Sequence, residues 1–410
     1  MLNWTKQFNI CCFLDNHEYQ LFHRSHECLL AVGAINSIEA NAGTAFEQLK
    51  KFSAGIKDWI FGHFAYDLKN ETENLYSSNS DGIQFPDLFF FIPEIIVELD
   101  KSRITIGSFN SDHTKILAQI YKAATTFSNT IHGNINIQSG FSKNEYIATI
   151  KQLRQHILLG NCYEINFCQE FYAEEAMTDP VQTYSMLGET SPAPFAAFYK
   201  LKDKYVMCAS PERYLKRTGN LLLSQPIKGT WARNIYDAGL DNYYKEKLFK
   251  SAKDRSENVM VVDLVRNDLS KICEEGSVRV DELYGVYTFP QVHQMISSVS
   301  GKLSGETHWV DVIKATFPMG SMTGAPKKIV LELIEQYEKR KRGIFSGAIG
   351  YVSPNGDFDF NVIIRTILYN QTHRYLSYHV GSGITFYSDE EKEYEECLLK
   401  AAAIKKVLTR

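Results

Sequence analysis

The chain has 410 residues, of which 44% are hydrophobic and 22% are charged. These proportions are typical of a soluble globular protein, and the length allows about two or three domains or one large one. The net charge is −4, from 44 Lys and Arg residues against 48 Asp and Glu residues. Because no basic excess is present to neutralise a phosphate backbone, nucleic acid is not expected as the main partner.

Apolar runs and cysteines give no sign of a membrane or of an oxidising compartment. The apolar run at 88–92 is followed at once by Pro93, whereas a membrane-spanning helix needs about 20 apolar residues. The first residues lack the small-residue cleavage site of a signal peptide. The eight cysteines are scattered without a C-x-x-C pair, so we expect reduced core residues rather than disulfides or a zinc site. The predicted compartment is the cytoplasm, with no membrane contact.

Residues 1–135 are expected to form short strands and helices rich in aromatic residues. The polar stretch 132–143 contains two glycines and is typical of a connection to a second segment, 141–408. That segment opens with a helix predicted from Lys143 to Leu159, which a Gly-Asn pair ends.

The segment 352–369 predicts a β-hairpin. An Asn-Gly turn signal at 355–356 lies between stretches in which apolar and polar residues alternate. A further strand is expected at 374–386, and it is predicted to break at Gly381 and Gly383. Alternating strands mixed with helices favour an antiparallel-rich α+β fold over a doubly wound parallel sheet.

The last predicted helix, 389–408, carries acids within its apolar stripe. A Ser-x-x-Glu capping box at 388–391 opens it. Glu393 and Glu396 lie within about 60° of each other around the helix, and Lys400 falls on the same side among apolar residues. Burying an unpaired charge is costly, so these groups need a partner or a metal ion. A solvated first turn, where acids simply favour the helix N-terminus, is the alternative interpretation.

A second acid pair, Asp254 and Glu257, precedes the largely apolar run 259–265. Their three-residue spacing places both carboxylates on the same face of a helix. Acids at this spacing before a core helix are common, so the pair alone is weak evidence. If it faced the acids of the last helix, the two pairs would form an oxygen-only site suited to Mg²⁺.

Two single residues also have more than one interpretation. Lys228, in the segment SQPIKGTWAR, is either a nucleophile or a surface lysine whose stem packs on apolar neighbours. His293, in FPQVHQMISSV, is either a catalyst or a hydrogen-bonded structural residue. The Gly-rich segments 320–327 and 381–383 match neither the P-loop nor the dinucleotide-binding fingerprint.

Together these segments resemble the chorismate-utilising family, which includes anthranilate synthase component I, isochorismate synthase and aminodeoxychorismate synthase component I. Seven blocks match in the family's order: GNCYEINFC, SPERYL, PIKGTWAR, ENVMVVDLVRNDL, FPMGSMTGAPK, SGAIGYVSPNGDFDFNVIIRT and GSGITFYSDEEKEYEECLLKA. The resemblance implies two antiparallel β-sheets packed face to face, with helices outside and the active site in the cleft between the sheets. It also implies that 141–408 is a chorismate-binding catalytic domain, intertwined with the more weakly matched N-terminal region 1–135.

The resemblance implies a reaction for Lys228. Aminodeoxychorismate synthases carry a lysine at this position, where anthranilate and isochorismate synthases usually carry alanine. The lysine would attack C2 of chorismate while the C4 hydroxyl leaves, and ammonia would then displace it and place the amine on C4. The implied product is 4-amino-4-deoxychorismate, a precursor of para-aminobenzoate and folate.

Other roles follow from the same resemblance. Glu212 matches the general acid, and His293 matches a histidine near the leaving hydroxyl. The implied ligands of a Mg²⁺ cofactor are Glu257 and Glu396 directly, and Asp254 and Glu393 through water. The implied substrate-binding groups are Thr230, Arg365, Lys400 and the backbone N–H groups around Gly381 and Gly383. No segment resembles a glutamine amidotransferase, so the expected source of ammonia is a separate amidotransferase subunit, component II.

The sequence departs from the family at two positions. Glu164 stands where many members have Gln and where isochorismate synthases have a water-activating Lys. Phe345 stands where anthranilate synthases often have a Tyr that binds a carboxylate. Two other functions are considered: anthranilate synthase component I, against which Lys228 argues, and a non-catalytic chorismate-binding protein, against which the complete set of acids argues.

Overall fold

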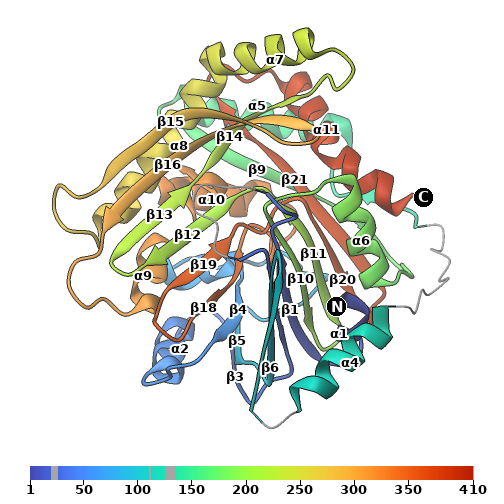
Figure 1. The fold of residues 1–410 in the computed structure, drawn as a ribbon. Helices are drawn as coiled ribbons and strands as arrows, with labels where there is room; N and C mark the ends of the chain where they lie inside the picture. The colour runs from blue at the N-terminus through green and yellow to red at the C-terminus, as the bar shows by residue number, and fades with distance from the viewer. Residues whose placement is uncertain (20–25, 110–111, 125–134, 410) are drawn as a thin grey trace.

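The computed structural model describes residues 1–19, 26–109, 112–124 and 135–409. It consists of two antiparallel sheets that pack face to face, with helices on the outer surfaces (Figure 1). The α+β class and the two-sheet architecture implied by the resemblance are therefore confirmed. Residues 132–134 of the predicted connection lie outside the described residues.

The first sheet contains eleven strands over the described ranges. In spatial order they are β17 (Gly324–Ala325), β9 (Glu164–Ala173), β21 (Tyr375–Thr385), β20 (Thr366–Asn370), β11 (Lys204–Ser210), β10 (Phe195–Leu201), β1 (Ile10–Asp15), β2 (Cys28–Val32), β6 (Ile95–Asp100) and β7 (Arg103–Ser108), with β8 (Gln138–Ser139) beside β9.

The second sheet contains ten strands over the same ranges. Their order is β14 (Ile227–Ala232), β16 (Val292–Lys302), β13 (Leu221–Gln225), β12 (Arg213–Thr218), β19 (Phe358–Asn361), β18 (Ala348–Val352), β4 (Ile60–Phe64), β5 (Leu88–Ile92) and β3 (Asn36–Ala40), with β15 (Arg279–Thr288) beside β16.

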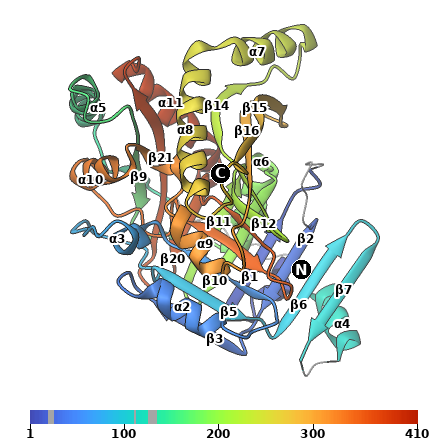
Figure 2. The ribbon, with the colours of Figure 1, turned by 90° about the vertical axis from the view of Figure 1, so that its left-hand side faces the viewer.

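Helices cover both outer faces and leave one core between the sheets. The helices of the described residues are α1 (Leu2–Thr5), α2 (Ala45–Ser53), α3 (Lys69–Thr72), α4 (His113–Ala124), α5 (Lys143–Leu158), α6 (Pro180–Thr190), α7 (Ala238–Lys250), α8 (Ala252–Ser270), α9 (Trp309–Thr316), α10 (Lys327–Tyr337) and α11 (Glu390–Leu408), with 3₁₀ turns η1 (Tyr66–Leu68) and η2 (Gly320–Met322). α5, α6, α10 and α11 pack on the first sheet, and α2, α8 and α9 pack on the second. α7 projects at the top of the molecule in both views (Figures 1 and 2).

Alternation along the strands produces these layers. Cys11 belongs to the core under the helices of the first sheet, and its neighbour Cys12 belongs to the core between the sheets. Strands of the N-terminal segment pair with strands of the second segment, because β1 lies beside β10 and β4 lies beside β18. Both segments therefore contribute to the same two sheets.

The predicted hairpin is present. β18 and β19 pair with Gly350 opposite Phe360, and Gly356 in the turn has a φ of 85°. Such a positive φ suits glycine, so the Asn-Gly signal located the turn correctly.

The predicted break at Gly381 and Gly383 is wrong, because β21 continues through both residues. They lie opposite Cys168 and Asn166 of β9. A Cβ atom on Gly381 would lie 2.2 Å from the carbonyl oxygen of Phe167, so a larger residue does not fit. Here the glycines permit two strands to approach closely rather than ending one of them.

The capping box predicted for the last helix is also wrong. The N-cap is Asp389, whose carboxylate accepts a hydrogen bond from the backbone N–H of Lys392. The Ser388 hydroxyl instead accepts a hydrogen bond from the backbone N–H of Thr385, at the end of β21. Asp is as good an N-cap as Ser, so the helix starts one residue later than the Ser-x-x-Glu pattern indicates.

All eight cysteines are buried and none is paired, as expected for reduced core residues. A search of the described ranges finds no helix with the length and apolar character that crossing a membrane requires.

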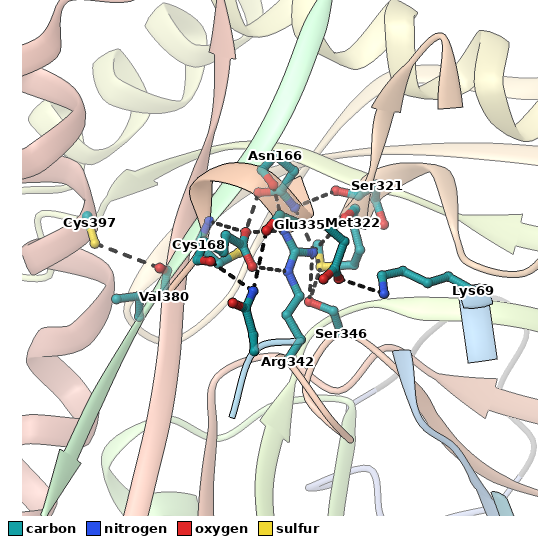
Figure 3. Close-up of polar contacts among 12 residues, drawn as sticks. Lys69, Asn166, Cys168, Ser321, Met322, Glu335, Arg342, Ser346, Val380 and Cys397 are labelled. Carbon is teal, nitrogen blue, oxygen red and sulfur yellow. Dashed lines mark hydrogen bonds and ion pairs between the residues drawn. The ribbon is translucent and has the colours of Figure 1, made fainter. Parts of the chain in front are cut away.

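A buried ion pair joins the first sheet to the 3₁₀ turn η2. Arg342 and Glu338 lie 2.6 Å apart between Nη2 and Oε1, and both side chains are at most 5% exposed. Arg342 donates hydrogen bonds to the carbonyl oxygens of Asn166 and Met322, each 2.7 Å long. Glu338 accepts a 2.9 Å hydrogen bond from the backbone N–H of Cys168. Figure 3 shows Arg342 at the centre of these contacts.

Replacing Arg342 with Gln should destabilise the fold strongly. The substitution leaves the Glu338 carboxylate buried without its cation, and breaking a buried pair on one side typically costs about 3–5 kcal/mol. Urea denaturation followed by circular dichroism measures the change. The matched control is Arg266→Gln, which removes an exposed pair with Asp263 and should cost at most about 1 kcal/mol. Equal losses in the two variants would contradict this account.

Candidate functional site

A cavity of about 930 Å³ opens between the sheets' upper strands and the helices α8 and α11. Its volume is that of a small-molecule binding site. Ten of the residues singled out from the sequence line it: Glu212, Lys228, Thr230, Asp254, Glu257, Arg365, Gly381, Gly383, Glu396 and Lys400. They come from both sheets and two helices, so the fold brings together residues that are far apart in sequence.

Glu393 and His293 do not line the cavity. Glu393 is 1% exposed and lies behind the cavity wall, where Lys253 contacts it at 3.2 Å. His293 is also 1% exposed, and its two ring nitrogens contact the Thr288 hydroxyl at 3.1 Å and the Asp241 carboxylate at 3.0 Å. These contacts suit a structural histidine.

Gln294 lines the cavity in place of its neighbour His293. It lies opposite Thr230 in the pairing of β14 with β16. Its side chain is 1% exposed, and neither the amide nitrogen nor the amide oxygen has a hydrogen-bond partner among the described residues. The side chains of adjacent strand residues face opposite sides of a sheet. Because Gln294 pairs with Thr230, which lines the cavity, Gln294 faces the cavity and its neighbour His293 faces away.

Glu212 is 2% exposed and lies between β11 and β12, at the inner end of the cavity. Burial raises its pKa to about 7, although Ser321 and Lys228 nearby act in the opposite direction. A carboxyl group with this pKa is partly protonated at neutral pH. It can therefore act as a general acid.

Lys228 lines the cavity and forms an ion pair with Glu164, which begins β9 and is buried next to the lining residues. Its Nζ lies 2.8 Å from Oε1 of Glu164, and the side chains are 11% and 2% exposed. Burial lowers the pKa of Lys228, but the carboxylates of Glu164, Glu257 and Glu212 outweigh burial and raise that pKa above its ordinary value. The lysine is therefore a cation in the resting protein.

The two acid pairs do approach each other, and a lysine lies among them. Lys253 of α8 contacts Glu257 at 3.8 Å on its own helix. On α11 the same ammonium contacts Glu393 at 3.2 Å and Glu396 at 3.9 Å. Within the described part of the chain, no three His, Cys, Asp or Glu side chains are spaced to hold a metal ion as they stand.

The chemistry of these donors nevertheless fits Mg²⁺. All of them are carboxylates, which Mg²⁺ prefers. Glu257 Oε1 and Glu393 Oε2 are buried and accept no hydrogen bond from the described residues. Glu257 Oε1 and the other oxygen of Glu393, Oε1, contact one cation, the Lys253 ammonium. A metal ion would take the place of that ammonium.

The backbone N–H groups of Gly381 and Gly383 point away from β9. Their partners there, Cys168 and Asn166, donate their own N–H groups to Glu338 and to the carbonyl oxygen of Thr323. In an antiparallel pair, residues that direct their N–H groups outward do so on both strands. β20 ends its pairing at Ser377, so both glycine N–H groups lie on an open edge of β21.

Two cations complete the cavity wall. The Arg365 guanidinium has no ion pair or hydrogen bond with the described residues, and burial lowers its pKa to about 10. Lys400 is engaged, because it contacts Glu396 at 2.8 Å and donates to the carbonyl oxygen of Gly381 at 3.0 Å. The Arg365 guanidinium is therefore available to an anionic ligand. Phe345 also lines the cavity and stacks on His379, with ring centroids 4.8 Å apart.

Comparison with known proteins identifies the class to which this site belongs. The family of chorismate binding enzymes matches residues 10–406. The chain belongs to this family.

Individual relatives within this family carry more specific names. The chain is 36% identical over 348 residues to aminodeoxychorismate synthase component 1 of Klebsiella aerogenes, and the aligned region covers 84% of this chain and 75% of that protein. It is 34% identical over 354 residues to the protein of the same name from Escherichia coli K12, covering 85% and 76% of the two chains. Among solved structures, anthranilate synthase component I from Streptococcus pneumoniae superposes with a TM-score of 0.79 at 25% identity, covering 96% and 95% of the chains.

Replacing Gln294 with Leu should weaken chorismate binding and stabilise the fold. The unpartnered amide is costly to bury, so its removal should raise the melting temperature, whereas a lost hydrogen bond to the ligand should weaken binding about 3- to 10-fold. Calorimetric titration and thermal denaturation measure the two effects.

The matched control is the adjacent variant His293→Gln. It removes the contact with Asp241 outside the cavity, so it should lower the melting temperature and leave chorismate affinity unchanged. The opposite pattern, with chorismate affinity lost only in the His293 variant, would show that His293 and not Gln294 contacts the ligand.

Proposed function

We propose that this protein aminates chorismate at C4 with ammonia and forms 4-amino-4-deoxychorismate, the reaction of an aminodeoxychorismate synthase. The observation that carries the proposal is Lys228, a buried lysine whose ammonium lies in the cavity of a chorismate binding enzyme. The names of the relatives at 34–36% identity support the same reaction.

The geometry suits a covalent route. Nζ of Lys228 would form a bond to C2 of the substrate as the C4–O bond breaks. Glu212 would give its proton to the leaving hydroxyl, because burial keeps this carboxyl partly protonated at neutral pH. Ammonia would then form the C4–N bond and release the lysine. The Arg365 guanidinium and the two outward glycine N–H groups would bind substrate carboxylates.

A Mg²⁺ cofactor is part of the proposal. Glu257 and Glu396 would hold it, with Asp254 and Glu393 acting through water. When bound, the ion would neutralise and orient a substrate carboxylate. Lys253 would leave the carboxylates as the ion enters, because its ammonium contacts three of these four acids.

The proposed source of ammonia is a separate glutamine amidotransferase subunit. Relatives of this chain are named component 1, which supports a second component. The purified chain is therefore expected to use ammonium salts, and glutamine only when that subunit is added.

Anthranilate synthase is the alternative function, and its support is the solved relative with the same fold. Formation of anthranilate requires amination at C2. A lysine whose Nζ already occupies the position facing the ring would obstruct direct attack of ammonia there. Lys228 therefore favours C4 amination.

Replacing Lys228 with Ala should remove the covalent route. With chorismate, Mg²⁺ and ammonium, the parent should form 4-amino-4-deoxychorismate and show an adduct on Lys228 by mass spectrometry of quenched samples. The variant should lose the adduct and most of this product, and its residual product should shift toward 2-amino-2-deoxyisochorismate or anthranilate. Lys204→Ala, which removes a lysine outside the cavity, is the control. Parental rates in Lys228→Ala would refute the role of this lysine.

Replacing Glu257 with Gln should abolish the response to Mg²⁺ without unfolding the protein. Burial raises the pKa of Glu257 to about 8 in the metal-free protein, so the neutral amide resembles the form already present at pH 7. Mg²⁺ at 100 times its Kd should stabilise the parent by about 2.7 kcal/mol and should not stabilise the variant. Thermal denaturation with and without Mg²⁺ measures this.

Glu391→Gln is the control for the metal experiment, since Glu391 lies on α11 but forms an exposed pair with Lys143. It should keep the full response to Mg²⁺. An equal response in Glu257→Gln would show that the ion binds elsewhere.

A further inference from the structure

Glu164 forms a direct contact with the reacting group of the proposed mechanism. It begins β9 of the first sheet, whereas Lys228 lies on β14 of the second sheet. Their ion pair, 2.8 Å between Oε1 and Nζ, therefore joins the first sheet to the second. Glu164 is one of the positions at which the sequence departs from the family it resembles. The proposed reaction, as described above, assigns no role to this residue.

Gly383 leaves room for the ion pair of Glu164 and Lys228. A Cβ atom on Gly383 would lie 2.8 Å from Nζ of Lys228 and 2.9 Å from Oε1 of Glu164, so only glycine leaves both groups in place. Neither carboxylate oxygen of Glu164 accepts a well-oriented hydrogen bond from the described residues. The carboxylate is thus not part of a structural hydrogen-bond network, and its interaction is with the lysine.

The charges around Lys228 keep it protonated before the reaction. Three carboxylates face it: Glu164 on β9, Glu257 on α8, and Glu212 between β11 and β12. Glu164 is the carboxylate within ion-pair distance among the described residues. An amine must lose its proton before it can act as a nucleophile. The protein therefore needs a proton acceptor next to Nζ.

We propose that Glu164 is this acceptor, a catalytic general base that takes a proton from Lys228 as the lysine attacks the substrate. The inference rests on the proposed function. A proton moves from Nζ to Oε1, and the nitrogen lone pair then forms the bond to C2. Both ring double bonds shift, C1=C2 to C1=C6 and C5=C6 to C4=C5, the C4–O bond breaks, and the proton of Glu212 joins the leaving hydroxyl to form water.

The second half-reaction restores both carboxyl groups. Ammonia forms the bond to C4, both double bonds shift back, and the C2–N bond breaks with its electron pair returning to Nζ. The new ammonium group on C4 passes a proton to Glu212, and Glu164 returns its proton to Lys228. The net change is chorismate and ammonia to 4-amino-4-deoxychorismate and water.

Glu164→Gln tests the inference, because the amide has the same shape and cannot accept the proton. In this variant Lys228 must lose its proton to solvent, so adduct formation should accelerate about tenfold per pH unit until the lysine is neutral. The experiment measures the rate of adduct formation on Lys228 by rapid quenching and mass spectrometry between pH 6 and 9. The rate of the parent divided by that of the variant should fall about tenfold per pH unit.

The ratio separates a general base from a structural role. Ionisation of Glu212 affects both proteins equally and cancels in the ratio. A purely structural defect would lower the rate by the same factor at every pH, so a constant ratio would overturn the inference. Glu164→Asp, which keeps a carboxylate, should react more slowly than the parent with a constant ratio.

The same experiment distinguishes failure of the inference from failure of the proposed function. If the parent forms no adduct on Lys228, the covalent route itself is wrong. If the parent forms the adduct and its ratio to Glu164→Gln is constant, only the role of Glu164 is wrong. A measurement without substrate adds a second readout: acetic anhydride should label Lys228 at lower pH in Glu164→Gln, because removing the negative charge lowers the pKa of the lysine. An unchanged labelling profile would also overturn the inference.

Discussion

The buried pair of Arg342 and Glu338 determines where the floor of the cavity lies. Its hydrogen bonds reach the backbone of β9 at Asn166 and Cys168 and the end of η2 at Met322. Because those backbone groups are turned toward the pair, the opposite glycines of β21 direct their own N–H groups outward. One ion pair in the core thus orients both Glu164 at the start of β9 and the open edge of β21.

The two-sheet architecture explains why charges of both signs meet in the cavity. The first sheet supplies Glu164, and the second supplies Lys228. The helices α8 and α11 pack on different sheets and carry the two acid pairs, which meet at Lys253. The ion pair between Glu164 and Lys228 therefore depends on the packing of one sheet against the other.

Local patterns were sufficient where one signal dominates, as for the Asn-Gly turn, and on the last helix they located the buried Glu393 but not the partial exposure of Glu396 and Lys400. They failed where tertiary contacts decide. From the sequence alone Gly383 is expected to end a strand. The fold instead requires glycine there, because Glu164 and Lys228 occupy the space that a larger side chain would need. His293 was predicted from the family resemblance, and in the strand register it is the neighbouring Gln294 that lines the cavity. Lys253 gave no signal, since the partner of its shortest contact in this cluster, Glu393, lies 140 residues away on α11.

Several buried polar atoms at this site have no hydrogen-bond partner in the part of the chain that the structure describes, and burying them lowers the stability of the fold. Oε2 of Glu164, Oε1 of Glu257 and both amide atoms of Gln294 are buried without hydrogen-bond partners among the described residues, whereas Oε1 of Glu164 forms the ion pair with Lys228. Each such atom destabilises the folded state, typically by about 1–3 kcal/mol. Folding alone would favour apolar side chains at these positions. A ligand that supplied the missing partners would recover this free energy on binding, so the same atoms would contribute to the affinity and specificity of the cavity.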